Sequence, residues 1–173
     1  MGNVILIGFM GTGKTTVGKA LAKALQLPHR DLDEEIVARE GCSIAEIFQS
    51  KGEPYFRDVE AELLDKLLRE QAQVLTTGGG AVLRQKNVAT MLERGIVIAL
   101  TASEAELIRR LECDSQRPLL AGGAAERIKA LLEQRKGAYD FAPIQIDTTE
   151  KTVDAIVAEI MARMVENDPS GKD

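Results

Sequence analysis

Residues 8–15 read Gly-Phe-Met-Gly-Thr-Gly-Lys-Thr and match the pattern G-x-x-x-x-G-K-[ST] without a gap. A short apolar run, Asn3 to Ile7, precedes them, and apolar residues at helical spacing follow from Val17 to Leu25. In this strand–turn–helix context, glycines let successive backbone N–H groups point at phosphate oxygens, and the helix start adds a positive dipole end. The sequence therefore predicts a phosphate-binding loop between a buried strand and a helix.

Within this loop we expect the nucleotide of Mg-ATP to be held by Gly11, Thr12, Gly13, Lys14, Thr15 and Thr16. Lys14 is expected to reach the β- and γ-phosphates and the Thr15 hydroxyl to ligate Mg²⁺. No Asn-Lys-x-Asp guanine-reading motif is present, which disfavours a GTPase. The small size of the chain disfavours a motor or transporter ATPase, so a compact kinase is favoured.

Strand and helix patterns alternate along the rest of the chain, which predicts an α/β fold with about five parallel strands. The expected strands after the first end near Asp31 or span 74–77, 96–100 and 144–147. Because ligands of such sheets gather at the carboxyl ends of the strands, the site is expected there. Expected helices begin near Asp33, after capping boxes at Ser43–Glu46 and Ser103–Glu106, and over 56–67, 125–139 and 153–164.

The chain is expected to form a single domain over residues 1–166, followed by a disordered tail over 167–173. Residues 113–123 (CDSQRPLLAGG) have no periodicity and are long for a connection in a compact domain, which predicts a mobile lid.

The composition of this 173-residue chain limits the classes of partner that we expect it to bind. Its net charge is −5 and it has four Phe, two Tyr and no Trp, so we expect no nucleic-acid surface. No apolar run is long enough to span a membrane and no charged leader opens the sequence. Cys42 and Cys113 fit no metal-ligand spacing. These features predict a cytoplasmic protein, and in the absence of a heptad seam a monomer.

Five further segments carry polar groups suited to an acceptor site. They are Asp31-Leu32-Asp33, Phe56-Arg57-Asp58-Val59-Glu60, Gly78-Gly79-Gly80, Arg117-Pro118-Leu119-Leu120 and Arg135-Lys136-Gly137-Ala138-Tyr139. Taken singly, each has a structural alternative: a helix cap for the Asp pair, a surface ion pair for Arg57 and Glu60, and flexible or solvated loops for the others. In this order, and with this phosphate loop, they resemble the shikimate kinases from Val4 to about Thr148.

The resemblance implies a three-layer α/β/α P-loop kinase fold with strand order 2-3-1-4-5. It implies that Asp33 binds acceptor hydroxyls and lies near the attacking one, and that Asp31 supports Mg²⁺ through water. A carboxylate suits this role because it accepts hydrogen bonds from vicinal hydroxyls and can take the proton lost in transfer.

The resemblance also implies that Arg57, held by Glu60, and Arg135 bind the acceptor carboxylate, which suits the planar donor fork of arginine. The Gly79 N–H would contact the acceptor, with Gly80 beside it. Arg117 would close over the ATP phosphates as a catalytic arginine, together with Lys14 and Asp33.

Adenine recognition departs from the family pattern. The resemblance places Arg110 against the adenine ring, and Lys151 stands near a position where many members carry a basic residue. The proline that usually follows that residue is absent, and the usual Ala-Asp pair is Ala142-Pro143 here. His29, the lone histidine, is expected to be structural or solvated.

The resemblance implies ATP:shikimate 3-phosphotransferase activity on the route to chorismate and the aromatic amino acids. Rival enzyme interpretations are a gluconate kinase or a nucleoside monophosphate kinase. A rival of another class is a nucleotide-binding regulator without turnover, although the presence of Lys14, Asp33, Arg57, Arg117 and Arg135 argues against it.

Overall fold

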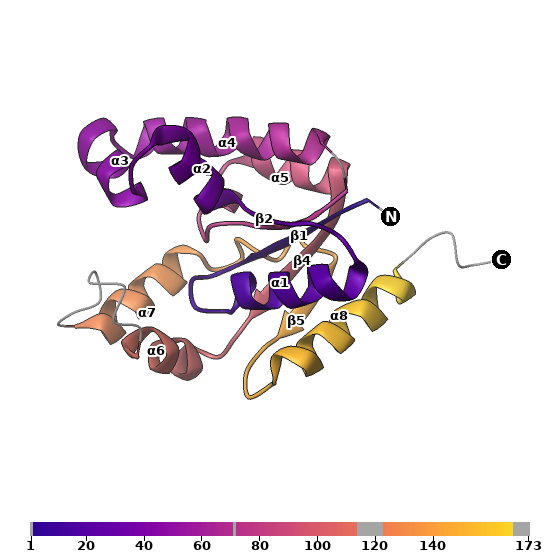
Figure 1. Cartoon of the computed structure of the whole chain (residues 1–173). Helices are drawn as coiled ribbons and strands as arrows, with labels where there is room; N and C mark the ends of the chain where they lie inside the picture. The colour runs from indigo at the N-terminus through magenta and orange to yellow at the C-terminus, as the bar shows by residue number, and fades with distance from the viewer. Residues whose placement is uncertain (1, 71, 114–122, 168–173) are drawn as a thin grey trace.

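The computed structural model describes residues 2–70, 72–113 and 123–167, which form five strands and eight α-helices in near-regular alternation (Figure 1). The strands are β1 (Asn3–Gly8), β2 (His29–Asp31), β3 (Val74–Thr76), β4 (Gly95–Thr101) and β5 (Ile144–Asp147). The helices are α1 (Lys14–Leu25), α2 (Leu32–Glu40), α3 (Ile44–Lys51), α4 (Glu53–Arg69), α5 (Gln85–Arg94), α6 (Glu104–Glu112), α7 (Ala124–Gln134) and α8 (Val153–Glu166), with a 3-10 turn η1 at Ala81–Leu83.

The five strands form one parallel sheet in the order β2-β3-β1-β4-β5. This confirms the predicted α/β class and strand order. β1 is the central strand, with Ile5 opposite Leu75 on one side and Val97 on the other. All six residues of β1 are buried, as expected for a strand covered on both faces.

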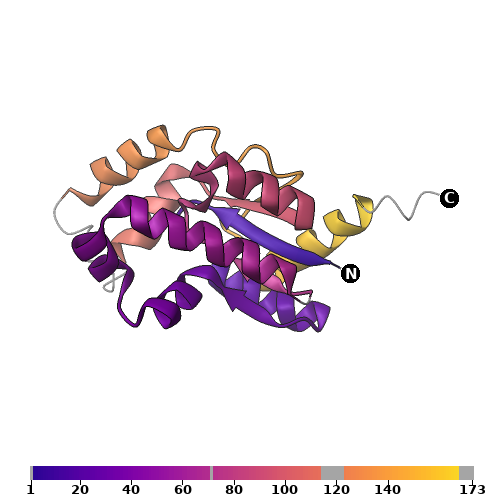
Figure 2. The same ribbon diagram turned by 90° about the horizontal axis from the view of Figure 1, so that it is seen from above.

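Side chains along β1 alternate between two hydrophobic cores, because successive residues of a strand point to opposite faces. Ile5 and Ile7 lie in the core beneath α4 and α5, whereas Val4 and Leu6 lie in the core formed with α1 and α8. Figure 1 shows α4 and α5 on one face of the sheet and α1 and α8 on the other, and Figure 2 shows α4 lying over the strands. The predicted three layers are therefore present.

Two helices differ from expectation. The helix predicted over 125–139 ends at Gln134, because residues 135–140 form turns in which Gly137 has a φ of +77°. Helix α5 was not predicted. Only Asn87 and Met91 of its ten residues are buried, and Arg84 at its N-terminus makes no side-chain capping bond. Neither an apolar stripe nor a capping signal therefore marks α5 in the sequence.

One of the two predicted capping boxes is complete. At the start of α3, Ser43 and Glu46 exchange both hydrogen bonds. At the start of α6, the Ser103 hydroxyl accepts a bond from the Glu106 N–H, but the Ser103 N–H donates to the Thr149 hydroxyl instead of to Glu106. The predicted second box was wrong in this half, because the Glu106 carboxylate is bound by two arginines described below.

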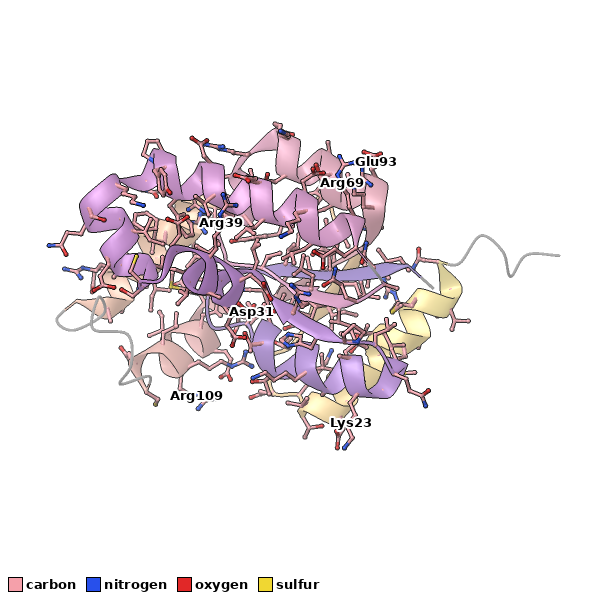
Figure 3. The ribbon with its side chains drawn as sticks, turned by 45° about the horizontal axis from the view of Figure 1, so that its top comes forward. Lys23, Asp31, Arg39, Arg69, Glu93 and Arg109 are labelled. Atoms are coloured by element: carbon pink, nitrogen blue, oxygen red, sulfur yellow. The ribbon has the colours of Figure 1, made fainter. Side chains whose placement is uncertain are left out.

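The carboxyl ends of β1, β2 and β3 meet at one edge of the sheet. In Figure 3 the labelled side chains of Lys23, Arg69 and Arg109 lie at the periphery, whereas Asp31 at the end of β2 lies between the helical layers. Most of the predicted lid (residues 114–122, including Arg117) and nearly all of the predicted tail (168–173) lie outside the described residues.

At Gly18 the backbone of α1 lies close to side chains of β2 and β3. A Cβ atom at Gly18 would lie 2.4 Å from Thr76 Cγ2 and 3.1 Å from His29 Nε2. Alanine in a helix interior is normally more favourable than glycine by about 1 kcal/mol. Here we expect Gly18→Ala to lower the free energy of unfolding by about 1–3 kcal/mol through overpacking, as measured by urea denaturation.

The control for this prediction is Gly2→Ala, because a Cβ there meets nothing within 4 Å. That variant should stay within about 0.5 kcal/mol of the parent chain. A stabilised Gly18→Ala variant would show that α1 is not packed as closely as described.

Candidate active site at the carboxyl edge of the sheet

The loop between β1 and α1 has the backbone geometry that the motif predicts. Gly11 and Gly13 have φ angles of +80° and +92°, values that L side chains rarely adopt. The buried Thr12 hydroxyl donates a hydrogen bond to the Phe9 carbonyl at 2.8 Å, which stabilises the turn. The loop therefore has a curved backbone that suits an anion, and the N–H groups at the start of α1 come directly after it.

Lys14 is 9% exposed, and its side chain folds back across the loop. Its ammonium donates to the carbonyls of Gly8 at 2.7 Å and Phe9 at 2.9 Å. These bonds satisfy the buried charge and hold it on the concave side of the loop, at the cleft. A bound polyphosphate would meet this ammonium there.

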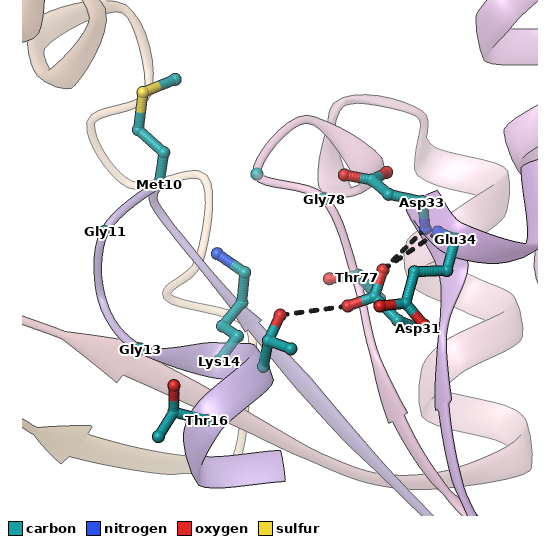
Figure 4. Close-up of a pocket in the computed structure, with 12 residues that line it drawn as sticks. Met10, Gly11, Gly13, Lys14, Thr16, Asp31, Asp33, Glu34, Thr77 and Gly78 are labelled. Carbon is teal, nitrogen blue, oxygen red and sulfur yellow. Dashed lines mark hydrogen bonds between the residues drawn. The ribbon is translucent and has the colours of Figure 1, made fainter. Parts of the chain in front are cut away.

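Asp31 connects the loop to the next two elements of the site (Figure 4). Its Oδ2 accepts hydrogen bonds from the hydroxyls of Thr15 at 3.1 Å and Thr76 at 2.7 Å. Its Oδ1 accepts from the N–H groups of Asp33 and Glu34 and so caps α2. Asp31 therefore caps a helix, which was the structural alternative considered for Asp31 and Asp33. The same carboxylate also faces the phosphate loop.

A cleft of about 520 Å³ opens between the loop, the start of α2 and the turn after β3. Figure 4 shows Met10, Gly11 and Lys14 on one side of it and Asp33 and Gly78 on the other. The lining residues are Met10, Gly11, Gly13, Lys14, Thr15, Thr16, Asp31, Asp33, Glu34, Thr77, Gly78 and Gly79. A Cβ at Gly78 would lie 2.8 Å from Asp33 Oδ1, so a larger residue here would require the turn or the Asp33 carboxylate to shift.

Arg57 on α4 lies against the far side of the same turn. A Cβ at Gly80 would lie 2.3 Å from Arg57 Nη2. The Arg57 Nη1 donates to Glu60 Oε1 at 2.8 Å, and the Glu60 side chain is only 1% exposed. Arg57 Nε and Glu60 Oε2 are buried without a hydrogen-bond partner.

The surface-pair alternative for Arg57 and Glu60 is therefore wrong for this pair, because the carboxylate is fully buried. Burial raises the pKa of Glu60 above its usual range, against the hydrogen bond and charge of Arg57, which lower it. Breaking such a pair leaves an uncompensated buried group, so Glu60 fixes the place of Arg57.

Arg135, just after α7, approaches the turn at its middle. A Cβ at Gly79 would lie 3.4 Å from Arg135 Nη1, and also 3.5 Å from the Met10 nitrogen in the phosphate loop. The Arg135 Nη1 donates to the Tyr139 hydroxyl at 3.3 Å. Arg57 and Arg135 thus come from different helical regions to neighbouring glycines of one turn; of these residues, Gly79 lines the cleft, and the two arginines and Gly80 are not among its lining residues.

Arg110 on α6 binds the other flank of the phosphate loop. It donates to the carbonyls of Gly11 at 3.1 Å and Thr148 at 3.1 Å, and its Nε donates to Glu106 at 2.8 Å. Hydrogen bonds from Arg109 and Arg110 lower the pKa of Glu106 to about 2. Arg110 therefore ties the loop to the segment after β5, where the adenine was expected.

Thr16 and Lys151, the other residues predicted to bind the nucleotide, lie in different places. Thr16 lines the cleft. Lys151 forms a 2.8 Å ion pair with Glu159 on α8 and is not among the residues that line the cleft.

His29 lies behind the site, in the structural role that was predicted for it. Its Nε2 is 3.1 Å from the Thr76 hydroxyl, and burial lowers the pKa of its imidazole below the usual range. Because the Thr76 hydroxyl donates its proton to Asp31, the His29 nitrogen must be the donor in this contact. Thr76 was not predicted as a site residue, because its only signal in the sequence is that it is a polar residue at the end of a buried strand.

Within residues 2–70, 72–113 and 123–167, no cluster of three His, Cys, Asp or Glu side chains could hold a metal ion. The Thr15 hydroxyl and Asp31 carboxylate nevertheless place two hard oxygen donors beside the phosphate loop, and Mg²⁺ is commonly bound by few protein ligands plus phosphates. In the same part of the chain, no helix has the length and apolarity to cross a membrane.

A parallel sheet in this order, with a lysine-bearing phosphate loop facing a carboxylate and two arginines, defines a small P-loop kinase. The family model described as shikimate kinase matches residues 10–165. A shikimate kinase of Geobacter metallireducens is 47% identical over 91% of this chain and 89% of its own length. The chain belongs to the shikimate kinase family.

Solved structures agree with this assignment. A shikimate kinase from Acinetobacter baumannii in complex with shikimate superposes with a TM-score of 0.90 at 34% identity, covering 98% of this chain and 96% of that one. A shikimate kinase from Aquifex aeolicus gives a TM-score of 0.81 at 36% identity, covering 95% and 97%. The fold and the family that the sequence indicated are thus confirmed.

The Glu106–Arg110 contact predicts a pH dependence of stability. In the unfolded chain the Glu106 carboxyl has a pKa near the ordinary value of 4.5, against about 2 in the folded protein. A lowered folded pKa stabilises the fold above the unfolded value and loses that effect as the pH falls through the folded value. We therefore expect Glu106→Gln to lower the free energy of unfolding at pH 7, and the deficit to shrink between pH 4.5 and 2.

Urea denaturation at pH 7, 5 and 3.5 measures this deficit. The matched control is Glu104→Gln in the same helical turn, whose carboxylate lies 3.9 Å from Lys129 and is 53% exposed. It should show little deficit at any pH. A deficit of Glu106→Gln that does not change with pH would contradict the assigned ionisation.

Proposed function

We propose that this chain transfers the γ-phosphoryl group of ATP to the 3-hydroxyl of shikimate, giving shikimate 3-phosphate and ADP. The observation that carries the choice of acceptor is the pair of guanidiniums, Arg57 against Gly80 and Arg135 against Gly79, beside the phosphate-loop cleft. Two planar donor forks at one turn suit a carboxylate, which accepts two parallel N–H bonds from each arginine it meets.

The proposed mechanism is in-line transfer across the cleft. Lys14 neutralises charge on the β- and γ-phosphates from the concave side of the loop. Asp33, which lines the opposite wall, accepts hydrogen bonds from the acceptor hydroxyls and takes the proton of the attacking one. The N–H groups of Gly79 and Gly80 contact the acceptor next to the arginines. Positioning and charge neutralisation supply most of the rate in such transfers.

The oxygen donors near the loop fit a magnesium ion. Mg²⁺ would be held by the Thr15 hydroxyl and, through water, by Asp31, and would neutralise charge on the phosphates. Arg117, outside the described residues, is proposed to close over the phosphates as an arginine supplied by the chain itself, with the segment 113–123 as the lid.

The adenine side of the proposal rests on Arg110. Stacking on a base uses the planar face of a guanidinium, so the hydrogen bonds of Arg110 to Gly11 and Thr148 are compatible with it. Lys151 would contact the nucleotide only after leaving Glu159. We further propose a cytoplasmic monomer on the route to aromatic amino acids, with no nucleic-acid or membrane partner.

A coupled assay of ADP release tests the reaction. We expect release from ATP to depend on shikimate, with gluconate and AMP as poor acceptors, because only shikimate presents a carboxylate on a ring with vicinal hydroxyls. Lys14→Ala should abolish shikimate-dependent release without unfolding the protein. Equal rates with gluconate or AMP would favour a rival kinase, and ATP binding without acceptor-dependent release would favour a regulator.

The carboxylate-binding role of Arg57 is tested by Arg57→Lys, which keeps the charge but removes the donor fork. We expect the KM for shikimate to rise about 10- to 100-fold while the KM for ATP stays within about twofold, as for the loss of a charge-assisted hydrogen bond. The control is Arg84→Lys, since Arg84 Nη1 donates to the exposed Asp58 carboxylate at 2.7 Å, whereas Arg57 lies against Gly80 of the turn. Similar KM values for shikimate in both variants would contradict the proposed role of Arg57 in binding the acceptor carboxylate.

A further inference from the structure

The Tyr139 hydroxyl makes two hydrogen bonds at the triple-glycine turn of residues 78–80, called here the acceptor turn. It donates to the Gly79 carbonyl at 2.7 Å, and it accepts from Arg135 Nη1 at 3.3 Å. This direction is the only possible one, because a carbonyl oxygen can only accept and a guanidinium can only donate. One phenol therefore connects the middle glycine of the turn to the arginine that approaches it.

The phenol is held in the protonated form that this arrangement needs. Burial raises the pKa of Tyr139 above its usual range, although the nearby charges of Arg135 and Arg57 act in the opposite direction. The hydroxyl therefore remains a donor to Gly79 at neutral pH.

The bond to the Gly79 carbonyl fixes a whole peptide plane. In a planar trans peptide, the carbonyl of Gly79 and the N–H of Gly80 point in opposite directions. With the carbonyl directed at Tyr139, the Gly80 N–H points away from it. Three successive glycines have little intrinsic preference for one backbone conformation. Backbone bonds from the Ala81 N–H to the Gly78 carbonyl at 3.2 Å and from the Leu83 N–H to the Gly80 carbonyl at 3.1 Å hold the two ends of the turn, whereas the Gly79 carbonyl in its middle accepts from the Tyr139 hydroxyl. Order at the middle of the turn therefore comes from this side-chain contact.

The ring of Tyr139 is well placed to supply that order. It packs against the core beneath α4 and also against the smaller core that contains Phe9, Leu107, Leu111 and Ile128. Phe9 belongs to the phosphate loop. The ring thus has a fixed position relative to both the loop and the acceptor turn, independently of its hydroxyl.

We propose that Tyr139 is a positioning residue for acceptor recognition: its hydroxyl sets the Arg135 guanidinium and the Gly79–Gly80 peptide in one fixed arrangement for the acceptor carboxylate. This inference rests on the proposed function, because it takes shikimate as the acceptor. It assigns no contact between Tyr139 and the reacting atoms.

The test is Tyr139→Phe, which removes the hydroxyl and keeps the ring in both cores. We expect the KM for shikimate to rise about tenfold, as for one hydrogen bond acting on a charged group, while kcat and the KM for ATP stay within about twofold. The control is Tyr55→Phe, because the Tyr55 hydroxyl bonds to Glu40 outside the cleft. It should leave both KM values unchanged.

A second acceptor separates positioning from general damage. Shikimate methyl ester lacks the carboxylate charge, so its kcat/KM should fall less than twofold in Tyr139→Phe, whereas that of shikimate falls about tenfold. An unchanged KM for shikimate overturns the proposal. So does an equal loss for shikimate and its ester, or a parallel loss of ATP affinity with a lowered Tm, since each indicates a purely structural role.

The parent chain distinguishes the two levels of inference. If the parent releases ADP with shikimate and Tyr139→Phe behaves like the parent, only the role of Tyr139 fails. If the parent shows no shikimate-dependent release, the proposed function fails, and the inference about Tyr139 fails with it.

Discussion

The carboxylate of Asp31 joins the elements on which the rest of the site depends. One oxygen accepts hydrogen bonds from Thr15 in α1 and Thr76 in β3, and the other caps α2. Strand β2 has only three residues, all paired with β3, and the side-chain bonds of Asp31 add to that pairing at the carboxyl end of the strand. Because α2 carries Asp33 in its first turn, the same carboxylate sets the distance between the phosphate loop and the opposite wall of the cleft.

On the side of the site proposed to bind the acceptor, a buried ion pair positions the binding group. Arg57 and Glu60 form an ion pair in which the carboxylate is almost completely buried, and such pairs gain little net stability because both charges lose their hydration. What the pair supplies is a fixed guanidinium at the surface of a glycine turn. The unpartnered Arg57 Nε and Glu60 Oε2 show that this place is held at some energetic cost.

How much of the site the sequence predicts depends on how local the interactions are. The strand, glycine loop and helix around Lys14 were predicted because they occupy one continuous stretch, and the D-x-D pair follows within the next strand and helix. Tyr139 contacts Gly79 across sixty positions, and no local pattern marks that contact. Roles for Arg57 and Arg135 came only from the family resemblance, since a lone arginine on a helix most often pairs on the surface. Helix α5 and the end of α7 were missed because tertiary packing and the backbone of Gly137 determine them.

The contact between Gly80 and Arg57 also limits how this chain could acquire another acceptor. Any side chain at position 80 would displace the guanidinium, and loss of the guanidinium would strand the Glu60 carboxylate in an apolar interior. Substitutions at positions 57, 60 and 80 are therefore expected to have coupled rather than additive effects on stability and on acceptor binding.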